Sequence, residues 1–490
     1  MTDIITQLLA KIGPGHMAST AYDTAWAARL GDIATEISNQ SLSWLVEHQL
    51  PDGSWGAPAP FYYHDRVLST LAAMIALTYR GRREHDKAQI EKGRLALERI
   101  VGNATAGLQA DPNGATVGFE MIAPILAEEA ERLGLIKNQR ERILGRLSQL
   151  RAKKLSYLRG KTISRHVTMA FSAEMAGRDG QHMLDVDNLQ ESNGSVGVSP
   201  SATAYFATYI RPGDKASLNY LRRVTNPDGG MPNVAPFDVF EIAWTLWNLS
   251  LVPGLDYREK LQPHLEYLSN AWEPKRGVAF STAYSVKDSD DTVVTYNALL
   301  RYGIEKDLAS ILAYEEEDHF RCFDLEVNPS ISTNIHILDA LLHAGFKRNN
   351  VSVQKILGFL RRARDRQFPF WVDKWHSSPY YATAHAIIAC AGMESDLVAE
   401  SVEWMIKTQN RNGSWGTYLP TAEETAYALQ ALWVWDQKAA RVPRGVLLNG
   451  ARWLKENLDL PYPPLWIGKC LYSPQMVVRS AIVSALTLIQ

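Results

Sequence analysis

The stretches SLSWLVEHQLPDGSWG (residues 41–56) and SVEWMIKTQNRNGSWG (residues 401–416) are two copies of one unit, and a weaker copy, NYLRRVTNPDGGMPN, spans residues 219–233. In each strong copy we expect the first Trp near the end of a helix and the Gln at its last turn. An Asp-Gly or Asn-Gly turn then reverses the chain so that the second Trp packs back. The matched positions are Trp44/Trp404, Gln49/Gln409, Gly53/Gly413 and Trp55/Trp415.

Helical periodicity dominates the rest of the chain. Apolar residues recur every three to four positions at residues 67–77, 239–251 and 425–435, whereas strand patterns are scarce. Helical hairpins of this kind cannot bury their apolar faces alone, so they stack on one another. With 490 residues the chain is long enough for two domains. The sequence therefore predicts an all-α fold with two helical barrels.

Composition excludes several classes of protein. The formal net charge of -2 gives no basic footprint for nucleic acid. The cysteines Cys322, Cys390 and Cys470 are far apart, which suits a reducing compartment and provides no zinc-ligand spacing. The N-terminus lacks the pattern of a signal peptide, and no long uncharged apolar run predicts a transmembrane segment. We therefore expect a cytoplasmic protein.

The sequence contains 14 Trp, 20 Tyr and 13 Phe, most of which we assign to the core and a minority to a cavity lining.

Three carboxylates are crowded before the apolar helix start VVTYNALL. They are Asp288, Asp290 and Asp291, in the sequence KDSDDT at residues 287–292. Three roles are open to them. One carboxylate can cap the helix, the mutual repulsion of the three can keep one protonated as a Brønsted acid, and their hard oxygens can bind a metal. A second candidate set of metal ligands lies on one predicted helix and consists of His336, Asp339 and His343. No third histidine lies at a position that would complete a zinc site.

The DSDD sequence at residues 288–291 resembles the DxDD signature of class II diterpene cyclases, and the likeness runs along nearly the whole chain. The sequence resembles in particular the bacterial enzymes of the tuberculosinyl (halimadienyl) diphosphate synthase type. It also resembles copalyl diphosphate synthases. The other matching blocks are TAYDTAW (20–26), QLPDGSWG (49–56), VGFEMIAP (117–124), SPSATAY (199–205), PNV (232–234), STNIHILDAL (332–341), DKWHSSPYY (373–381) and PLWIGKCLY (464–472).

The resemblance implies two α-barrel domains. Residues 1–33 and 250–490 would form the β domain, residues 34–249 the inserted γ domain, and the active site would lie between them. The length leaves no room for the third, α domain of plant relatives, and the ionising DDxxD motif of class I synthases is absent. The diphosphate of a prenyl diphosphate substrate would therefore be retained. A downstream class I terpene synthase or another diphosphate-processing enzyme would then use the product.

The resemblance also assigns roles to single residues. Asp290 would be the general acid, and Asp288 and Asp291 would orient it and hold its proton. Asn334 matches the asparagine that hydrogen-bonds the acid, although it also suits a helix N-cap. Lys374 matches a diphosphate-binding lysine. Lys154 is a second candidate, with an ordinary surface lysine as the alternative. Aromatic faces stabilise migrating carbocations, and the candidate liners are Trp272, Tyr284, Trp375, Tyr380 and Tyr381.

Termination of the reaction is expected to differ from that in plant relatives. The Asn of PNV is present as Asn233, but the histidine paired with it is not, and the corresponding stretch AFSAEMAG (170–177) carries Glu174 instead. Glu174 is either a replacement base or a charged residue on a helix. Because the usual base is missing, we expect a rearranged halimadienyl or clerodienyl (kolavenyl) skeleton. Mg²⁺ would assist diphosphate binding, with Glu120 as a ligand or, alternatively, as part of a structural salt bridge.

Three other functions remain open at this point. A drimenyl diphosphate synthase acting on farnesyl diphosphate would differ only in cavity depth. A squalene–hopene-type triterpene cyclase shares the acid motif and the Trp-rich repeats, but Lys374 argues against a hydrocarbon substrate. Outside enzymology, a helical repeat protein can serve as a binding scaffold, in which case the acidic cluster would be a solvated helix cap.

Overall fold

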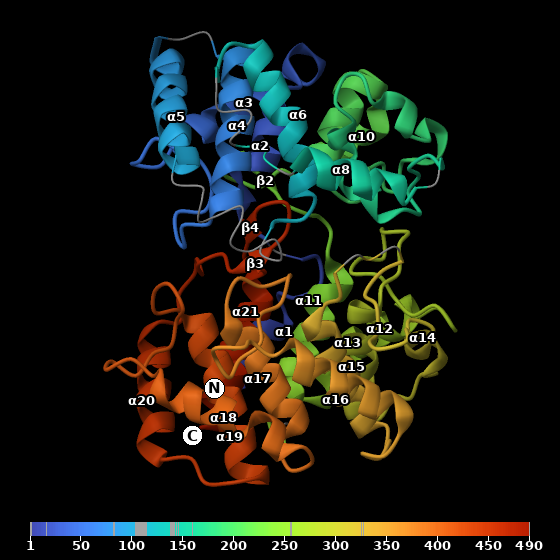
Figure 1. Cartoon of the computed structure of the whole chain (residues 1–490), viewed down its shortest axis with the longest axis vertical. Coiled ribbons are helices and arrows are strands. Elements are labelled where there is room, and N and C mark those ends of the chain that lie inside the picture. Colours follow the sequence, from blue (N-terminus) through green and yellow to red (C-terminus); the bar gives the residue numbers. More distant parts are fainter. Residues whose placement is uncertain are drawn as a thin grey trace.

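Two helical units are stacked along the long axis of the molecule (Figure 1). The computed structural model describes residues 2–15, 17–81, 84–102, 115–137, 143, 145, 147–158, 160–254, 257–324, 326 and 328–489. We call the unit drawn at the bottom of Figure 1 the lower barrel and the one at the top the upper barrel. The predicted all-α fold is confirmed.

The lower barrel is a closed ring of helices inside a second layer. Each inner helix packs against the next, and the last packs against the first, so the ring closes. The inner helices are α11 (Asp238–Ser250), α13 (Ser289–Arg301), α15 (Ile331–His343), α17 (Pro379–Cys390), α19 (Ala422–Lys438) and α21 (Gln475–Leu488). The outer helices are α1 (Thr2–Leu9), α12 (Arg258–Ala271), α14 (Ala309–Leu312), α16 (Val351–Ala363), α18 (Ser395–Lys407) and α20 (Arg444–Glu456).

The upper barrel repeats this arrangement with fewer described helices. Its ring also closes, through a 3-10 helix at Thr168–Ala176 that packs between α6 and α9. The other ring helices are α2 (Ala21–Ala28), α4 (Tyr63–Arg80), α6 (Phe119–Arg132) and α9 (Pro200–Tyr205). The outer helices are α3 (Thr35–Glu47), α5 (Glu84–Gly102), α8 (Leu147–Ser156) and α10 (Lys215–Val224).

Each barrel has its own apolar core. The core of the lower barrel combines the segment Ile5–Ile12 with residues between Val239 and Leu488. The core of the upper barrel runs from Ala21 to Met231 and includes Cys470 from the C-terminal part of the chain. These cores divide the chain differently from the predicted boundaries after residues 33 and 249. Helix α2 belongs to the upper barrel, because Tyr22 and Trp26 are buried in its core. Helix α11 belongs to the lower barrel, because it closes the ring between α13 and α21.

A hairpin near the C-terminus reaches from the lower barrel into the upper one. Strands β3 (Trp466–Ile467) and β4 (Leu471–Tyr472) form it, and they lie between the two units in Figure 1. At its turn, the carbonyl of Gly468 accepts a hydrogen bond from the amide of Val117, at 2.7 Å. The second described strand pair, β1 (Ser19–Thr20) with β2 (Met231–Pro232), lies where the chain passes between the barrels.

The repeated Trp residues fasten helix ends, as predicted. The indole N–H of Trp55 donates to the carbonyl of Leu45 at 2.7 Å, and that of Trp415 donates to Met405 at the same distance. Trp371 makes the same bond to Leu360, at 2.8 Å. This unit does not stand out as a repeat in the sequence, because the turn before Trp371, DRQFPF (365–370), contains no glycine.

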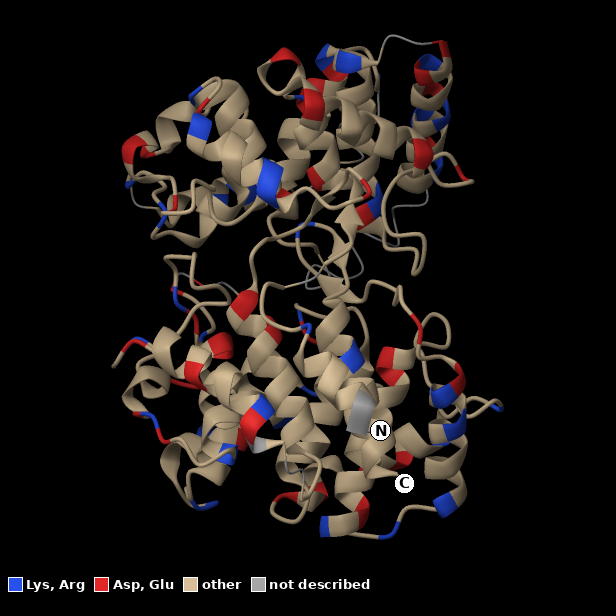
Figure 2. Ribbon diagram, turned by 180° about the vertical axis from the view of Figure 1, so that it is seen from behind, with Lys and Arg blue, Asp and Glu red and all other residues tan. Residues whose placement is uncertain are grey.

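Acidic and basic residues are interspersed over both units (Figure 2). None of the described helices has the length and apolar character needed to cross a bilayer.

Candidate active site

The acidic DSDD sequence begins α13. Asp288 is the N-cap residue, and its Oδ1 accepts a hydrogen bond from the amide of Asp291 at 2.8 Å. The capping role open to this cluster therefore belongs to Asp288, which leaves Asp290 and Asp291 in the first helical turn.

Burial raises the pKa of two of the three carboxyls. Burial raises the pKa of Asp288 to about 7. Burial, followed by the charge of Asp288, raises the pKa of Asp291 well above its usual range. Asp288 Oδ2 and Asp291 Oδ1 are buried without a hydrogen-bond partner in the described part of the chain. Burial is the largest cause of both shifts, and the crowding of charges that the sequence suggested adds to it.

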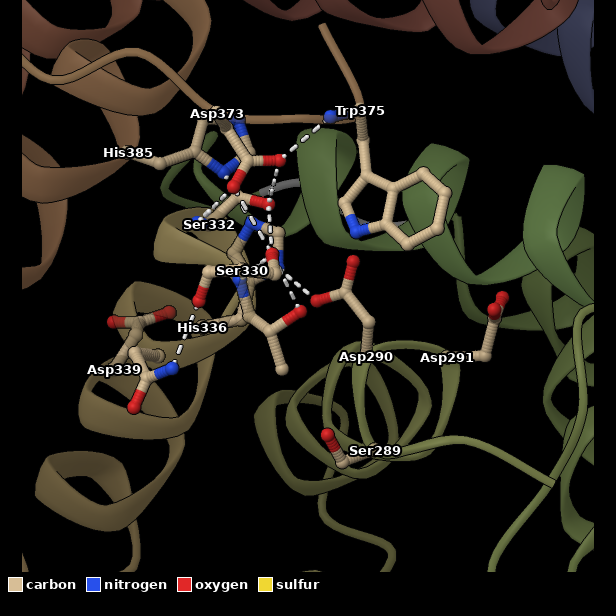
Figure 3. A network of polar contacts seen from close by, with 12 residues as sticks. Ser289, Asp290, Asp291, Ser330, Ser332, His336, Asp339, Asp373, Trp375 and His385 are labelled. Atoms are coloured by element: carbon tan, nitrogen blue, oxygen red, sulfur yellow. Dashed lines mark hydrogen bonds and ion pairs between the residues drawn. The ribbon is translucent and has the colours of Figure 1, made fainter. Parts of the chain in front are cut away.

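Asp290 contacts His336, the first of two hydrogen-bonded histidines. Its Oδ1 lies 2.7 Å from Nδ1 of His336 on α15, and Nε2 of His336 lies 2.8 Å from Nδ1 of His385 on α17 (Figure 3). Asp290 is 9% exposed and each histidine 3%. Figure 3 shows Asp290 pointing toward His336, while Asp291 points away from it. Three neighbouring inner helices thus supply a line of three titratable side chains.

Asn334 does not make the predicted contact with the acid. Its amide oxygen accepts from the backbone N–H of Phe320, and its amide nitrogen donates to the carbonyls of Phe320 and Ser330. These bonds attach the 320 loop to α15, and the N-cap of that helix is Ser330. His336 lies two residues further along α15 and makes the contact instead. It was visible in the STNIHILDAL block, but there it suggested only a metal ligand.

Asp373 holds the start of α15 and the loop that carries Trp375. Its Oδ1 accepts from the amide of Ile331 at 2.7 Å, and its Oδ2 accepts from the amide of Trp375 at 3.0 Å. This carboxylate therefore fixes both the helix of His336 and an indole near Asp290 (Figure 3). Asp373 was not among the residues predicted from the sequence, although it lies in the DKWH block.

Three of the five aromatic candidates lie near the acidic cluster. Tyr381 stacks on His376, with ring centroids 4.8 Å apart, and the charge of Asp290 contributes to the raised pKa of its buried hydroxyl. The indole nitrogen of Trp375 is buried and has no partner in the described residues. Tyr284 belongs to the cluster between the barrels that is defined below.

The other two aromatic candidates pack elsewhere. Trp272 lies beside Tyr296, and Tyr380 stacks on Trp404, with ring centroids 4.7 Å apart. Both fill space between inner and outer helices, so their contacts do not support a cavity-lining role. Trp244 and Trp466 lie nearer to Asp290, since each packs against Tyr381 or His336. The sequence signal for these two was only their apolar surroundings.

An apolar interface cluster lies between the DSDD sequence and the upper barrel. Its buried members are Met17, Val198, Val234, Phe237, Ala279 and Tyr284. Phe171 from the upper barrel and Tyr472 from the hairpin pack against it. Burial, followed by the charge of Asp291, raises the pKa of the Tyr472 hydroxyl. The cluster thus has the acid motif at one end and Phe171 at the other.

A buried ion pair lies beyond Phe171. Nζ of Lys469, at the turn of the hairpin, lies 2.6 Å from Oε1 of Glu174 and donates to the hydroxyls of Ser199 and Ser201 at 2.7 Å. The hydroxyl of Tyr22 donates to the same Glu174 oxygen at 2.8 Å. Lys469 was overlooked in the sequence, although the PLWIGKCLY block contains it.

Asn233 belongs to the same polar cluster. Its amide nitrogen donates to Oδ2 of Asp23 at 2.9 Å, while the amide of Ser201 donates to Oδ1 of Asp23 at 3.2 Å. Burial raises the pKa of Asp23 to about 6. The structure therefore brings Glu174 and Asn233 together around Lys469 and Asp23.

The two candidate phosphate-binding lysines lie on different barrels. Lys154 on α8 forms an ion pair with Glu120 on α6, which joins two of the predicted residues. Lys374 forms an ion pair with Glu326, donates to the carbonyl of Asn328 at 2.7 Å, and lies 4.9 Å from the ring centroid of Trp375.

The histidine-containing metal set has protein partners. Asp339 accepts from Arg301 at 2.9 Å and from Trp247 at 3.3 Å, and His343 contacts Asp339. His336 is engaged by Asp290 and His385. In the described ranges, no group of three or more His, Cys, Asp or Glu side chains is arranged to hold a metal ion.

A closed helical ring that holds buried carboxyls with raised pKa values beside an apolar interface suits an enzyme that gives protons to an apolar substrate. Comparison with known proteins agrees with this class. Residues 320–453 match the family described as the squalene-hopene cyclase C-terminal domain.

Full-length relatives define the family more narrowly. The chain is 46% identical over 490 residues to the type B diterpene cyclase of Mycobacterium tuberculosis, covering 98% of each chain. It is 29% identical to the ent-copalyl diphosphate synthase of a Streptomyces species, covering 100% of this chain and 95% of the relative. The solved ent-copalyl diphosphate synthase from Streptomyces platensis superposes with a TM-score of 0.82 at 30% identity, covering 99% and 98% of the two chains. The chain belongs to the class II diterpene cyclases.

Proposed function

We propose that this cyclase converts geranylgeranyl diphosphate into a bicyclic diterpenyl diphosphate, with Asp290 as the proton donor. The 2.7 Å contact between Asp290 Oδ1 and His336 Nδ1 carries the proposal. A donor on one oxygen stabilises the carboxylate that remains once the proton has left the other. Burial and, after it, the charge of Asp290 raise the pKa values of Asp288 and Asp291, so the cluster disfavours three negative charges at once.

The reaction balances without an external reagent. The O–H bond of Asp290 breaks, and the terminal double bond of the substrate takes the proton, which leaves a tertiary carbocation. Two further double bonds attack in turn and close two rings, and loss of a proton ends the sequence. Substrate and product are isomers, and the diphosphate is retained. Trp375, Tyr381 and Tyr284 present aromatic surfaces that stabilise the cation without trapping it.

We assign the diphosphate to the surroundings of Lys154 and Lys374. Each lysine supplies a point charge and is paired with a carboxylate, Glu120 or Glu326. Mg²⁺ commonly binds through one or two carboxylates together with substrate phosphates, and Glu120 fits such a carboxylate. The ion, when bound, would neutralise the charge of the diphosphate.

For the product we propose a rearranged halimadienyl or clerodienyl (kolavenyl) skeleton. Glu174 Oε1 is engaged by Lys469 and Tyr22, and the amide of Asn233 is engaged by Asp23. The proton acceptor we assign is Glu174 Oε2, which has no partner among the described groups. Since Oε2 is the only oxygen of Glu174 left to accept a proton, a cation centre that forms away from it undergoes hydride and methyl shifts before a proton is lost.

A product assay tests the proposal. The purified protein is incubated with geranylgeranyl diphosphate and Mg²⁺, treated with phosphatase and analysed by mass spectrometry, beside Asp290→Asn and the exposed control Asp324→Asn. We expect a bicyclic diterpene alcohol from the parent and the control that is absent with Asp290→Asn. An unchanged product from Asp290→Asn overturns the role of Asp290.

The same assay separates the alternatives. Cyclisation of farnesyl diphosphate but not of geranylgeranyl diphosphate indicates a drimenyl diphosphate synthase, and cyclisation of squalene alone indicates a triterpene cyclase. The scaffold alternative is set aside because the chain belongs to an enzyme family. If the alcohol appears only after phosphatase treatment, the diphosphate is retained, and a class I terpene synthase or another diphosphate-processing enzyme is needed to use the product.

A further inference from the structure

His385 lies behind His336, on the side away from Asp290. Its Nδ1 is 2.8 Å from Nε2 of His336, and this is its only hydrogen-bond contact among the described groups. Asp290 contacts the other nitrogen of His336, so the middle ring has one partner on each side. The two histidines come from α15 and α17, which are neighbours in the inner ring.

Aromatic rings enclose His385. It stacks on Trp247, with ring centroids 4.5 Å apart and an interplanar angle of 21°. Tyr381 lies at 4.5 Å and Tyr427 at 5.9 Å. Burial, followed by the proximity of His336, lowers the pKa of His385 well below its usual range. This environment favours the neutral imidazole of His385, which has a single N–H.

The surroundings determine which nitrogen of His385 carries that hydrogen. Nε2 is buried and has no partner in the described part of the chain. Buried N–H groups without an acceptor are rarer in proteins than acceptors without a donor. The favoured tautomer therefore has its N–H on Nδ1, where it donates to Nε2 of His336.

The tautomer of His385 determines the tautomer of His336 and thereby the hydrogen bond to Asp290. If Nε2 of His336 accepts a hydrogen bond, a neutral His336 carries its own hydrogen on Nδ1. That N–H then donates to Oδ1 of Asp290, at 2.7 Å. An oxygen that accepts a hydrogen bond in this direction is not the one that bears the acidic proton, so the proton belongs on Oδ2.

We propose that His385 is a positioning residue that sets the tautomer of His336 and thereby places the acidic proton of Asp290 on the oxygen that is free to face the substrate. The catalytic part of this inference rests on the proposed role of Asp290. The tautomers themselves do not depend on that role. With the opposite tautomers, the O–H group of Asp290 would donate to Nδ1 of His336, and its proton would not face the substrate.

Nitrogen NMR of the full-length protein, labelled with ¹⁵N in histidine, tests the tautomers directly. Chemical shifts distinguish protonated from unprotonated ring nitrogens, and spectra of His336→Gln and His385→Asn assign the two rings. We expect His336 to be protonated on Nδ1 and unprotonated on Nε2, and His385 likewise. A proton on Nε2 of His336, alone or in a doubly protonated ring, overturns the proposal.

Kinetics of two variants test the consequence. In His385→Asn the side-chain amide can still donate to His336, whereas His385→Leu removes the donor at similar volume. We expect kcat of the Leu variant to fall about tenfold or more, with little change in KM, and the Asn variant to recover most of the loss. Equal losses in both variants, or none in either, overturn the proposal.

The two experiments also separate this inference from the proposed function. If Asp290→Asn still cyclises substrate while the NMR spectra show the expected tautomers, the proposed acid is wrong and the tautomer assignment stands. If Asp290→Asn is inactive but His336 carries its proton on Nε2, the acid stands and the positioning role of His385 fails.

Discussion

Lys469 and Glu174 form an ion pair of 2.6 Å in which neither side chain is exposed to solvent. The lysine comes from the hairpin of the lower barrel and the glutamate from the 3-10 helix of the upper barrel, so the pair fastens the two units together. Burial of two charges is unfavourable unless they are paired and hydrogen-bonded. Ser199, Ser201 and Tyr22 provide the additional hydrogen bonds.

Removal of one member of this pair should destabilise the protein. Lys469→Met leaves the Glu174 carboxylate buried without its counter-charge, which typically costs about 3–5 kcal/mol. We expect a lower free energy of unfolding by urea denaturation. The double variant Lys469→Met/Glu174→Gln should regain part of the loss, because it buries no unpaired charge. Equal stability of the parent and Lys469→Met would show that the ion pair is not a structural fastener.

Removal of His336 should affect the chemical step. His336→Phe keeps a ring of similar size but provides no donor for Oδ1 of Asp290. We expect kcat to fall by about 10²–10⁴ while KM stays close to that of the parent, as measured in steady-state product assays. The exposed His182→Phe is the control for a substitution of the same kind. Parent-like kcat in a folded His336→Phe protein would contradict the assigned partnership.

The buried N-cap carboxyl predicts a pH dependence of stability. The pKa of Asp288 is about 7 in the folded protein, against an ordinary value of 3.8. The folded state therefore binds the proton more tightly than the unfolded state. The stability that this proton provides is complete below about pH 4 and is lost as the pH rises to about 7, at up to about 1.4 kcal/mol per pH unit.

Asp288→Asn should remove that dependence and keep the helix cap, since Asn is an equally good N-cap residue. We expect the unfolding free energy of the variant, relative to the parent, to increase between about pH 4 and 7 and to level off above that range. Urea titrations at several pH values measure it, and Asp324→Asn, an exposed carboxylate, is the control. A difference that does not change with pH would mean that Asp288 is ionised throughout.

The sequence predicted contacts that are local. Trp415 bonds to a carbonyl 10 residues away, and Gln409 bonds to the carbonyl of Gly413, so the repeat itself contains the information. The contact between Asp290 and His336 spans 46 residues, and that between Lys469 and Glu174 spans 295. Both depend on how the helices close into rings and how the barrels meet. No pattern within one helix distinguishes His336 from Asn334 as the partner of the acid.

Lys154 should act on substrate binding and not on the chemical step. Its ammonium group is partly exposed and is paired only with Glu120 in the described structure. An interaction with the diphosphate is made equally in the bound substrate and in the transition state, because the diphosphate does not react. Lys154→Ala should therefore raise KM for geranylgeranyl diphosphate several-fold and leave kcat nearly unchanged.

Lys153→Ala, which changes the exposed neighbour on the same helix, is the matched control. If both variants keep the parent KM, Lys154 is an ordinary surface lysine whose role ends with its ion pair to Glu120. If KM rises only for Lys154→Ala, the diphosphate lies at the upper barrel, and its distance from Asp290 then limits how the substrate chain spans the interface.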